Sequence, residues 1–297
     1  MISLNGLGKP QYLFRPSQIV RRLLQEISPR AAAADVRLPW GLRIALDTGD
    51  TVSEAIRGQG LYDLVTTEVL WRLTLPGERT VDVGANVGYV TSLLAVRTGS
   101  TGLVFAFEPH PKTYGVLQRN VNRWNAQPGC GRITSVQAAL SNADGTAVLD
   151  TLEGRDANAS HAHITAPGAP GIDVQALRFD THFAAKNAFG VVKVDAEWHE
   201  AAIFDGMAEH LHSGRIRDIV YEENAGYPAP SHKVLESAGY TVFAFEEQLS
   251  GPRMDAPTSV RGVKRPYDIA PSYLATRDPD RARHLFSRKG WQSLRGH

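Results

Sequence analysis

Short apolar runs alternate with helix-like segments from Thr80 onward, and this alternation limits the fold more than any other feature of the 297-residue sequence. Strands that alternate with helices are typical of a mostly parallel sheet with helices on both faces. The apolar runs predict seven strands, at residues 80–83, 103–107, 133–140, 191–194, 216–221, 240–245 and 267–276. Helical spacing predicts helices at residues 62–73, 87–98, 111–124, 199–213 and 230–238. We therefore expect a doubly wound, Rossmann-like α/β fold with a mostly parallel seven-stranded sheet.

Two further strand-like segments, residues 145–149 and 174–179, interrupt this alternation. Between them lies a long stretch of small residues that contains His161 and His163. Long loops of this kind often act as lids or binding loops. We expect an inserted β segment, and solvated loop histidines are a simpler interpretation of His161 and His163 than a shared ligand.

The chain on either side of the sheet is expected to form two attachments. Residues 1–60 hold an amphipathic helical pattern at residues 17–27 and an extended segment at residues 37–47, which together predict an N-terminal cap. The predicted main domain covers residues 61–277, and a basic helical tail covers residues 278–297. Such a tail is more often a solvated helix face than a binding site for an anionic partner.

Composition and charge exclude several classes of protein. With 42% hydrophobic and 21% charged residues the chain is close to an average soluble protein, and its net charge of +1 argues against a chain built to grip nucleic acid. The single cysteine, Cys130, cannot form an intramolecular disulfide, which favours a reducing compartment. No apolar run approaches the ~20 residues that span a bilayer, and the first residues lack a signal-peptide pattern. We expect a soluble, cytoplasmic protein.

The first predicted strand ends in a glycine-containing turn, residues 82–88 (DVGANVG). Ligands of open parallel sheets bind beyond the carboxyl ends of the strands, and Gly84 and Gly88 allow the backbone to approach a ligand closely. The dinucleotide fingerprint requires glycine where Asn86 stands, so the turn favours S-adenosylmethionine over a nicotinamide dinucleotide. Asp82 is expected to meet the amino group of the methionine moiety.

The second predicted strand ends in Glu108, which follows Gly88 by 20 residues. A carboxylate at this place can accept hydrogen bonds from both ribose hydroxyls of a nucleoside. Glu108 is therefore the expected ribose ligand, and a second role as a cap of the following helix is compatible with it.

The fourth predicted strand runs into a dense group of ionisable residues, Lys193, Asp195, Glu197, His199 and Glu200. Alternation places Lys193, Asp195 and Glu197 on one side of the extended chain. A carboxylate at the end of an apolar strand is costly to bury without a partner, which favours a functional role for Asp195. Asp195 or His199 is the candidate base, and Lys193 is expected to keep Asp195 ionised. Helix capping is the alternative role for Glu197 and Glu200.

The fifth predicted strand ends in Glu222, Glu223 and Asn224, at the same edge of the sheet as Asp195. Carboxylate and amide oxygens are typical ligands of Mg²⁺, which would lower the pKa of a substrate hydroxyl. The sequence thus leaves two alternatives, a metal site at Asp195, Glu222 and Glu223 or a reaction without metal.

With these motifs in place, the chain resembles the FkbM family of methyltransferases over about residues 61–245. The shared features are the turn at residues 81–88, the Phe-Glu-Pro end of the second strand at residues 107–109, and the lysine–aspartate–glutamate element from Lys193. The resemblance implies a class I methyltransferase fold. One position departs from the family pattern, because Trp198 stands where the family usually has glycine; the flat ring could stack on a sugar or an aromatic substrate.

The resemblance also implies the residues of the cofactor site. The implied ligands of S-adenosylmethionine are Asp82, Gly84, Asn86, Gly88 and Glu108, with Leu140 and Ser141 near the adenine and Glu68 near the methionine end. Several members methylate hydroxyl groups of sugars or secondary metabolites. We therefore expect O-methyl transfer, in which Asp195, or a metal that it holds, deprotonates an acceptor hydroxyl.

Such an enzyme acts mainly by aligning its two substrates. Fixing the nucleophile, the methyl carbon and the sulfur in one line can lower the activation barrier of methyl transfer by ~7 kcal/mol. Methylation of an amine is the first alternative, and a non-catalytic binding module is the second. The intact glycine turn and the ionisable cluster from Lys193 argue against the module. A small molecule is the expected partner, with a homodimer left open as the assembly.

Overall fold

The computed structural model describes residues 35–47, 51–150, 163–165, 168–196, 198–257 and 271–294. The predicted helix at residues 17–27, His161, Glu197 and the beginning of the last predicted strand lie outside these ranges.

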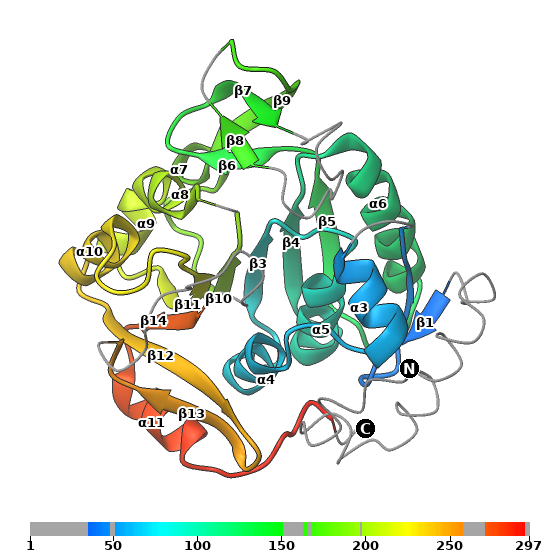
Figure 1. The fold of residues 1–297 in the computed structure, drawn as a ribbon, viewed down its shortest axis with the longest axis vertical. Helices are drawn as coiled ribbons and strands as arrows, with labels where there is room; N and C mark the ends of the chain where they lie inside the picture. The colour runs from blue at the N-terminus through cyan, green and yellow to red at the C-terminus, as the bar shows by residue number, and fades with distance from the viewer. Residues whose placement is uncertain are drawn as a thin grey trace, which may run out of the picture.

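The main sheet has eight strands in the order β13–β12–β14–β11–β10–β3–β4–β5 (Figure 1). In chain order they are β3 (Arg79–Val83), β4 (Leu103–Phe107), β5 (Arg132–Val136), β10 (Phe189–Val194), β11 (Ile216–Glu222), β12 (Thr241–Gln248), β13 (Gly251–Asp255) and β14 (Ser272–Thr276). Strands β3, β4, β5, β10 and β11 pair in parallel, whereas β14 runs antiparallel to β11 and β12. The doubly wound, mostly parallel fold is confirmed. The eighth strand, β13, was not predicted; it extends the edge as the hairpin partner of β12.

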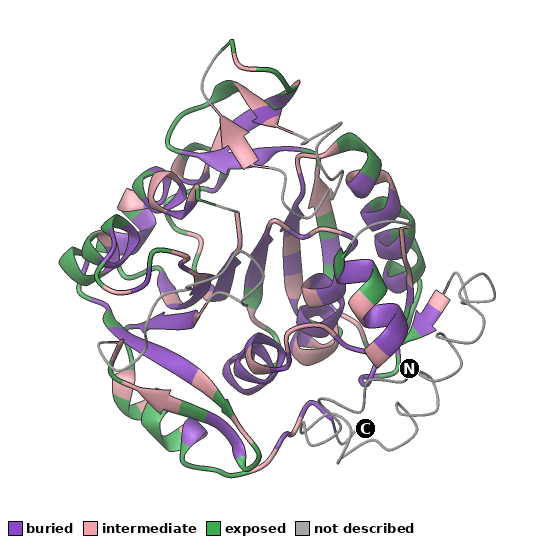
Figure 2. Cartoon of the chain, in the orientation of Figure 1, coloured by how far each residue is buried: buried purple, intermediate pink, exposed green. Residues whose placement is uncertain are grey.

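Helices cover both faces of the sheet, because successive strand residues point to opposite sides. Val191 belongs to one hydrophobic cluster and Val192 to the other. The first face packs against α3 (Thr51–Gln59), α4 (Leu64–Leu73), α5 (Tyr89–Thr98), α6 (Pro111–Asn125) and α11 (Pro279–Phe286). The second face packs against α7 (Phe179–His182), α8 (Glu200–Gly206), α9 (Ala208–His212) and α10 (Pro230–Ser237). Figure 2 shows the resulting band of buried residues along the central strands.

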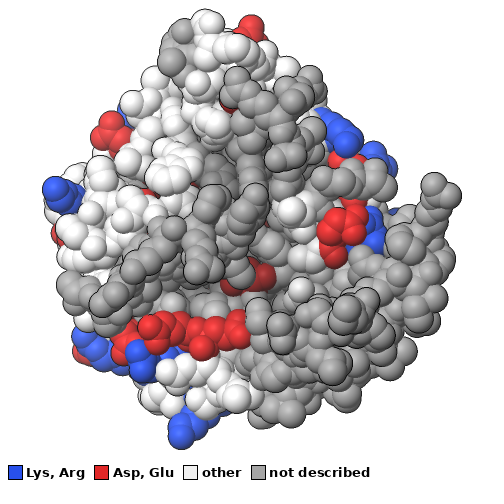
Figure 3. Space-filling model, in the orientation of Figure 1, with Lys and Arg blue, Asp and Glu red and all other residues white. Residues whose placement is uncertain are grey.

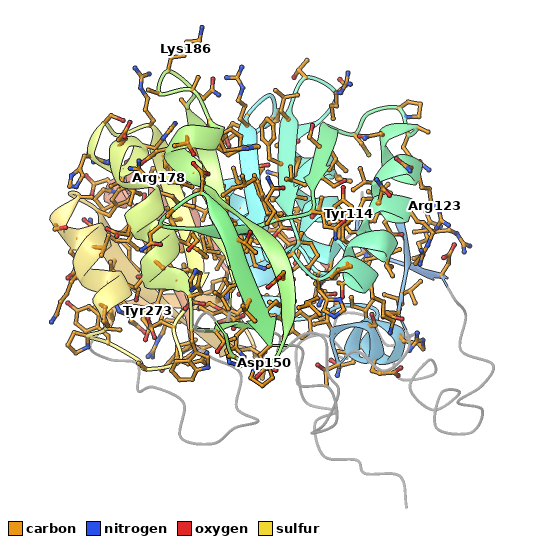
Figure 4. The ribbon with its side chains drawn as sticks, turned by 90° about the horizontal axis from the view of Figure 1, so that it is seen from above. Tyr114, Arg123, Asp150, Arg178, Lys186 and Tyr273 are labelled. Carbon is orange, nitrogen blue, oxygen red and sulfur yellow. The ribbon has the colours of Figure 1, made fainter. Side chains whose placement is uncertain are left out.

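The predicted strand at residues 133–140 is two strands that belong to different sheets. After β5 the chain enters β6 (Ala139–Ser141), which pairs in parallel with an inserted strand. The second sheet has the order β6–β9–β7–β8 and consists of β6, β7 (Gly145–Asp150), β8 (His163–Thr165) and β9 (Ile172–Arg178). The inserted β segment is therefore present, with β8 as an additional strand. In Figure 4, Asp150 and Lys186 mark opposite ends of the molecule, so the end of β7 lies toward the carboxyl ends of the parallel strands.

The two attachments pack into the main core. The extended segment predicted at residues 37–47 is a hairpin of β1 (Asp35–Arg37) and β2 (Arg43–Ala45), and Ile44 joins the cluster that holds α5 and α6. Beyond α11, Trp291 is 1% exposed and Leu294 is 3% exposed. The basic residues Arg283, Arg288 and Lys289 are exposed, as the interpretation of a solvated face requires, whereas these two apolar side chains are buried. Among the described residues, no helix combines the length and the apolar character that crossing a membrane requires.

Candidate functional site

A cavity opens where β3, β10 and β11 end, beside the glycine turn. The empty space within its walls is about 1310 Å³, with the open solvent at its mouth included. Figure 3 shows acidic atoms at the bottom of the hollow on this face.

The glycine turn has the backbone geometry that its sequence requires. Gly84, Asn86 and Gly88 all have positive φ, at 71°, 49° and 96°. A Cβ atom on Gly84 would lie 1.9 Å from the backbone oxygen of Asp195, and one on Gly88 would lie 3.0 Å from the ring of Trp124. Both glycines are therefore needed for the close packing of the turn, which leaves Gly84 and Asn86 on the cavity wall.

Glu108 holds this turn against the end of β4. Its two carboxylate oxygens accept hydrogen bonds from the backbone N–H groups of Asn86 and His110, each at 2.9 Å. Burial raises the pKa of Glu108 to about 7, although the two hydrogen bonds lower it. The side chain lines the cavity, as a ribose ligand must.

Lys193 is the centre of a buried charge cluster below the turn. Its Nζ lies 3.1 Å from Asp195 Oδ2 and 3.7 Å from Asp82 Oδ1, and it donates a hydrogen bond to the backbone oxygen of Gly84 at 3.2 Å. Burial alone would lower the pKa of Lys193, but the charges of Asp195 and Asp82 raise it above its usual value. Lys193 and Asp195 both line the cavity, so the structure brings the predicted pair together at the predicted edge.

Four residues predicted to bind the cofactor, Glu68, Asp82, Gly88 and Ser141, do not line the cavity, and the first two have carboxylates that face elsewhere. Asp82 is fully buried under the turn, where its Oδ2 accepts a hydrogen bond from Thr91 Oγ1 at 2.6 Å, and it does not line the cavity. Glu68 is also fully buried; it pairs with Arg72 at 2.7 Å and accepts hydrogen bonds from the backbone of Gln292 and Ser293. The prediction that Glu68 reaches the cofactor is wrong, because its carboxylate ties down the C-terminal segment. Asp82 forms an ion pair with Lys193 and has no contact with the cavity.

The residues expected near the adenine, Leu140 and Ser141, belong to β6, beside the candidate base His199. Leu140 and His199 line the cavity, and Ser141 Oγ lies 3.0 Å from His199 Nε2. Burial lowers the pKa of His199, which favours the neutral imidazole. The contact with Ser141 already engages Nε2 of His199. His163, from the inserted strand β8, lines the same cavity rather than being a solvated loop residue.

The predicted metal ligands do not converge. Glu222 lines the cavity, whereas the carboxylate of Glu223 turns away and bonds Ser231 Oγ and the backbone N–H of Ala225. Asp195 is paired with Lys193. Among the residues that the structure describes, no group of three metal-binding side chains is present. The residues do not fit a Mg²⁺ site, because one ligand points elsewhere and another already has a cation.

Asp63 and Tyr221 are among the lining residues that the sequence analysis did not single out. Asp63 is the N-cap of α4, and Tyr221 is the penultimate residue of β11. Tyr221 is 1% exposed, and its hydroxyl has no hydrogen-bond partner in the described part of the chain. The Asp63 side chain accepts a hydrogen bond from Thr66 N at 3.1 Å, an N-cap that the Asp-x-x-Thr sequence could have indicated. No sequence signal marks the Tyr221 hydroxyl.

The model of the methyltransferase FkbM domain matches residues 82–242, more than half of the chain. The chain belongs to the FkbM family of methyltransferases. It is therefore an S-adenosylmethionine-dependent methyltransferase with the class I fold, as the sequence indicated.

Two curated methyltransferases are similar to this chain. The hexuronic acid methyltransferase AglP of Haloferax volcanii is 26% identical over 216 residues, which cover 66% of this chain and 85% of AglP. The methyltransferase sdnD of Sordaria araneosa is 26% identical over 221 residues, which cover 63% of this chain and 83% of sdnD. A solved FkbM methyltransferase from Methylobacillus flagellatus KT aligns over 87% of this chain and 60% of its own, with 13% identity and a TM-score of 0.44.

The charge of the cavity fits the cofactor of an FkbM methyltransferase. Four carboxylates line its described part, those of Asp63, Glu108, Asp195 and Glu222, and Lys193 is the one lysine or arginine among the described lining residues. S-adenosylmethionine carries a sulfonium and an ammonium group, so a cavity with surplus negative charge attracts it. The turn from Gly84 and the carboxylate of Glu108 are the groups suited to hold its ribose end.

Proposed function

We propose that the protein transfers the methyl group of S-adenosylmethionine to a hydroxyl of a small molecule, a sugar or a secondary metabolite. The observation that carries this proposal is the carboxylate of Asp195, which lies on the cavity wall at the end of β10 and 3.1 Å from the ammonium group of Lys193. The bound cofactor supplies an electrophilic methyl group on its sulfonium. Asp195 would accept the proton of the acceptor hydroxyl as the new carbon–oxygen bond forms and the bond between the methyl carbon and sulfur breaks, which leaves S-adenosylhomocysteine.

The buried groups around Asp195 support this role. Lys193 contacts Oδ2 of Asp195, which leaves Oδ1 for the acceptor. The backbone N–H of Asp195 donates to Val83 O at 3.2 Å, so the strand end is fixed against the glycine turn. Fixing base, acceptor and cofactor in one geometry is the main contribution expected of this site.

The acceptor class rests on one support, a relative of this chain. AglP, which is similar to this chain, is named for a hexuronic acid, and such a sugar acid carries several hydroxyl groups. The reaction needs no metal, because Asp195 and Lys193 supply the base and its counter-charge.

Methylation of an amine is the second candidate, and the acidic lining of the cavity favours it. Asp195 and Glu222 would attract a protonated amine. Analysis of the methylated product separates the two, since NMR distinguishes an O-methyl from an N-methyl group.

The substitution Asp195→Asn tests the proposed base. S-adenosylhomocysteine release is followed with a panel of neutral sugars, uronic acids, phenols and amines, and cofactor affinity is measured by calorimetry. We expect turnover to fall by roughly 10²- to 10⁴-fold, the usual contribution of a positioned base, with cofactor affinity retained. The control is Asp205→Asn on the exposed side of α8. Full activity of the Asp195 variant would remove Asp195 from the chemistry.

A further inference from the structure

Asp63 lines the cavity, and one of its carboxylate oxygens has no hydrogen-bond partner in the described part of the chain. The residue caps α4 with positive φ, 34°, and one oxygen, Oδ1, accepts the hydrogen bond from Thr66 N at 3.1 Å. The second oxygen, Oδ2, is buried and makes no hydrogen bond to any residue that the structure describes. Asp63 lines the cavity together with the glycine turn and Asp195. A buried acceptor of this kind is costly unless a ligand satisfies it.

The surroundings of Asp63 are negative. Burial raises its pKa, the hydrogen bonds of Thr66 lower it, and the charge of Asp195 raises it further. The neighbouring cation, Lys193, is held by Asp195, Asp82 and the backbone oxygen of Gly84. The described lining offers no other lysine or arginine to Asp63. Two carboxylates that repel one another, one of them with a free oxygen, form a receptor for a positive charge.

We infer that Asp63 binds a positively charged group of S-adenosylmethionine through its free oxygen, Oδ2. This inference rests on the cofactor dependence of the family and not on the nature of the acceptor. The cofactor carries two cations, the α-ammonium of its methionine moiety and the sulfonium. Asp63 thus takes the ligand role that the sequence suggested for Glu68. Asp63 is the N-cap of α4, and Glu68 follows it within that helix.

The substitution Asp63→Asn isolates the charge. Asparagine keeps an oxygen that caps α4 and tolerates positive φ, so the helix start is preserved. Affinity is measured by calorimetry, without acceptor, for three ligands. S-adenosylmethionine has both cations, S-adenosylhomocysteine has the ammonium alone, and 5′-methylthioadenosine has neither.

We expect Asp63→Asn to weaken S-adenosylmethionine binding by roughly 10- to 100-fold, the size of a charge-assisted hydrogen bond. An equal loss for S-adenosylhomocysteine with unchanged 5′-methylthioadenosine binding supports the inference and assigns the ammonium. A loss confined to S-adenosylmethionine supports it and assigns the sulfonium. Unchanged binding of all three ligands, or an equal loss for all three, overturns it.

The matched control is Asp278→Asn, the same change at the N-cap of α11, where the side chain accepts a hydrogen bond from Arg281 N at 3.0 Å outside the cavity. It should leave the affinity for all three ligands unchanged. Thermal unfolding of both variants provides a second measurement. Removal of an unsatisfied buried charge should leave the melting temperature of Asp63→Asn equal to or above that of the parent protein. A lower melting temperature with uniformly weaker binding would make Asp63 a helix cap alone and overturn the inference.

Discussion

The carboxylate of Glu108 accepts a hydrogen bond from the backbone N–H of Asn86 at 2.9 Å, which fastens the glycine turn to the next strand of the sheet. The same carboxylate lines the cavity, and burial raises its pKa to about 7. One group therefore supports the turn and titrates near neutral pH.

Cofactor affinity should consequently depend on pH through Glu108. Two ribose hydroxyls can both donate to an ionised carboxylate but not to a protonated one. Below pH 7 the proton must leave before the ribose binds, so affinity should rise roughly tenfold from pH 6 to pH 8. Calorimetry with S-adenosylhomocysteine checks this. In Glu108→Gln the affinity should be lower and nearly independent of pH over this range.

The stability of the ligand-free protein should have the opposite pH dependence. The pKa of Glu108 and that of Glu200 are both raised from 4.5 to about 7 by burial, so the folded state holds protons that the unfolded state has released. This stabilisation is present below pH 4.5 and is lost as pH rises through 7.

Glu200→Gln is the control for the pH dependence of cofactor affinity, since Glu200 does not line the cavity. If that variant also lost the pH dependence of affinity, Glu108 would not be its source.

Glu68 and Arg72 should matter for stability and not for the cofactor. Arg72 donates to the backbone oxygens of Leu285, Arg288 and Gly290, and Glu68 accepts from the segment that follows. Glu68→Gln leaves the buried guanidinium of Arg72 without its counter-charge. We expect a loss of about 3–5 kcal/mol in the free energy of unfolding by urea, with unchanged cofactor affinity at a temperature where the variant is folded. Weaker cofactor binding by a fully folded variant would return Glu68 to the cofactor site.

The sequence predicted those parts of the site that depend on neighbours in the chain. The strand–turn–helix at Gly84 and the carboxylates at the ends of β4 and β10 follow from local pattern, because parallel strands bring their carboxyl ends to one edge. Lys193 and Asp195 alternate along one strand, so their pairing is also a local consequence.

The errors concern contacts between distant parts of the chain. The partners of Glu68 lie 224 and 225 residues away, and no periodicity reports such a contact. The break between β5 and β6 is invisible for a similar reason, since an apolar run does not say to which sheet each half belongs. Glu223 follows the end of β11, and its carboxylate contacts Ala225 and Ser231 instead of the cavity that Glu222 lines.

Trp198 occupies a backbone conformation that glycine adopts more readily than tryptophan. Its φ is 69°, and its side chain is 68% exposed between Ala196 and His199, which line the cavity. Positive φ costs a residue with a Cβ atom about 1–2 kcal/mol, so a bulky residue here is retained at a cost to stability. Strain of this kind is common at functional sites, which favours a role for the ring in acceptor binding.

Replacement of Trp198 should separate backbone strain from the function of the ring. Trp198→Gly relieves the strain but increases the conformational entropy of the unfolded chain. Because these effects oppose each other, its free energy of unfolding should stay within about 1 kcal/mol of the parent. Trp198→Ala keeps the strain and loses the ring. Both variants should raise the KM for the acceptor by about 2- to 12-fold, the value of an aromatic contact, with kcat and cofactor affinity unchanged. The control is Leu249→Ala, an exposed apolar side chain, 57% exposed, between β12 and β13. A KM for the acceptor that stays constant in both tryptophan variants would show that the ring lies outside the acceptor site.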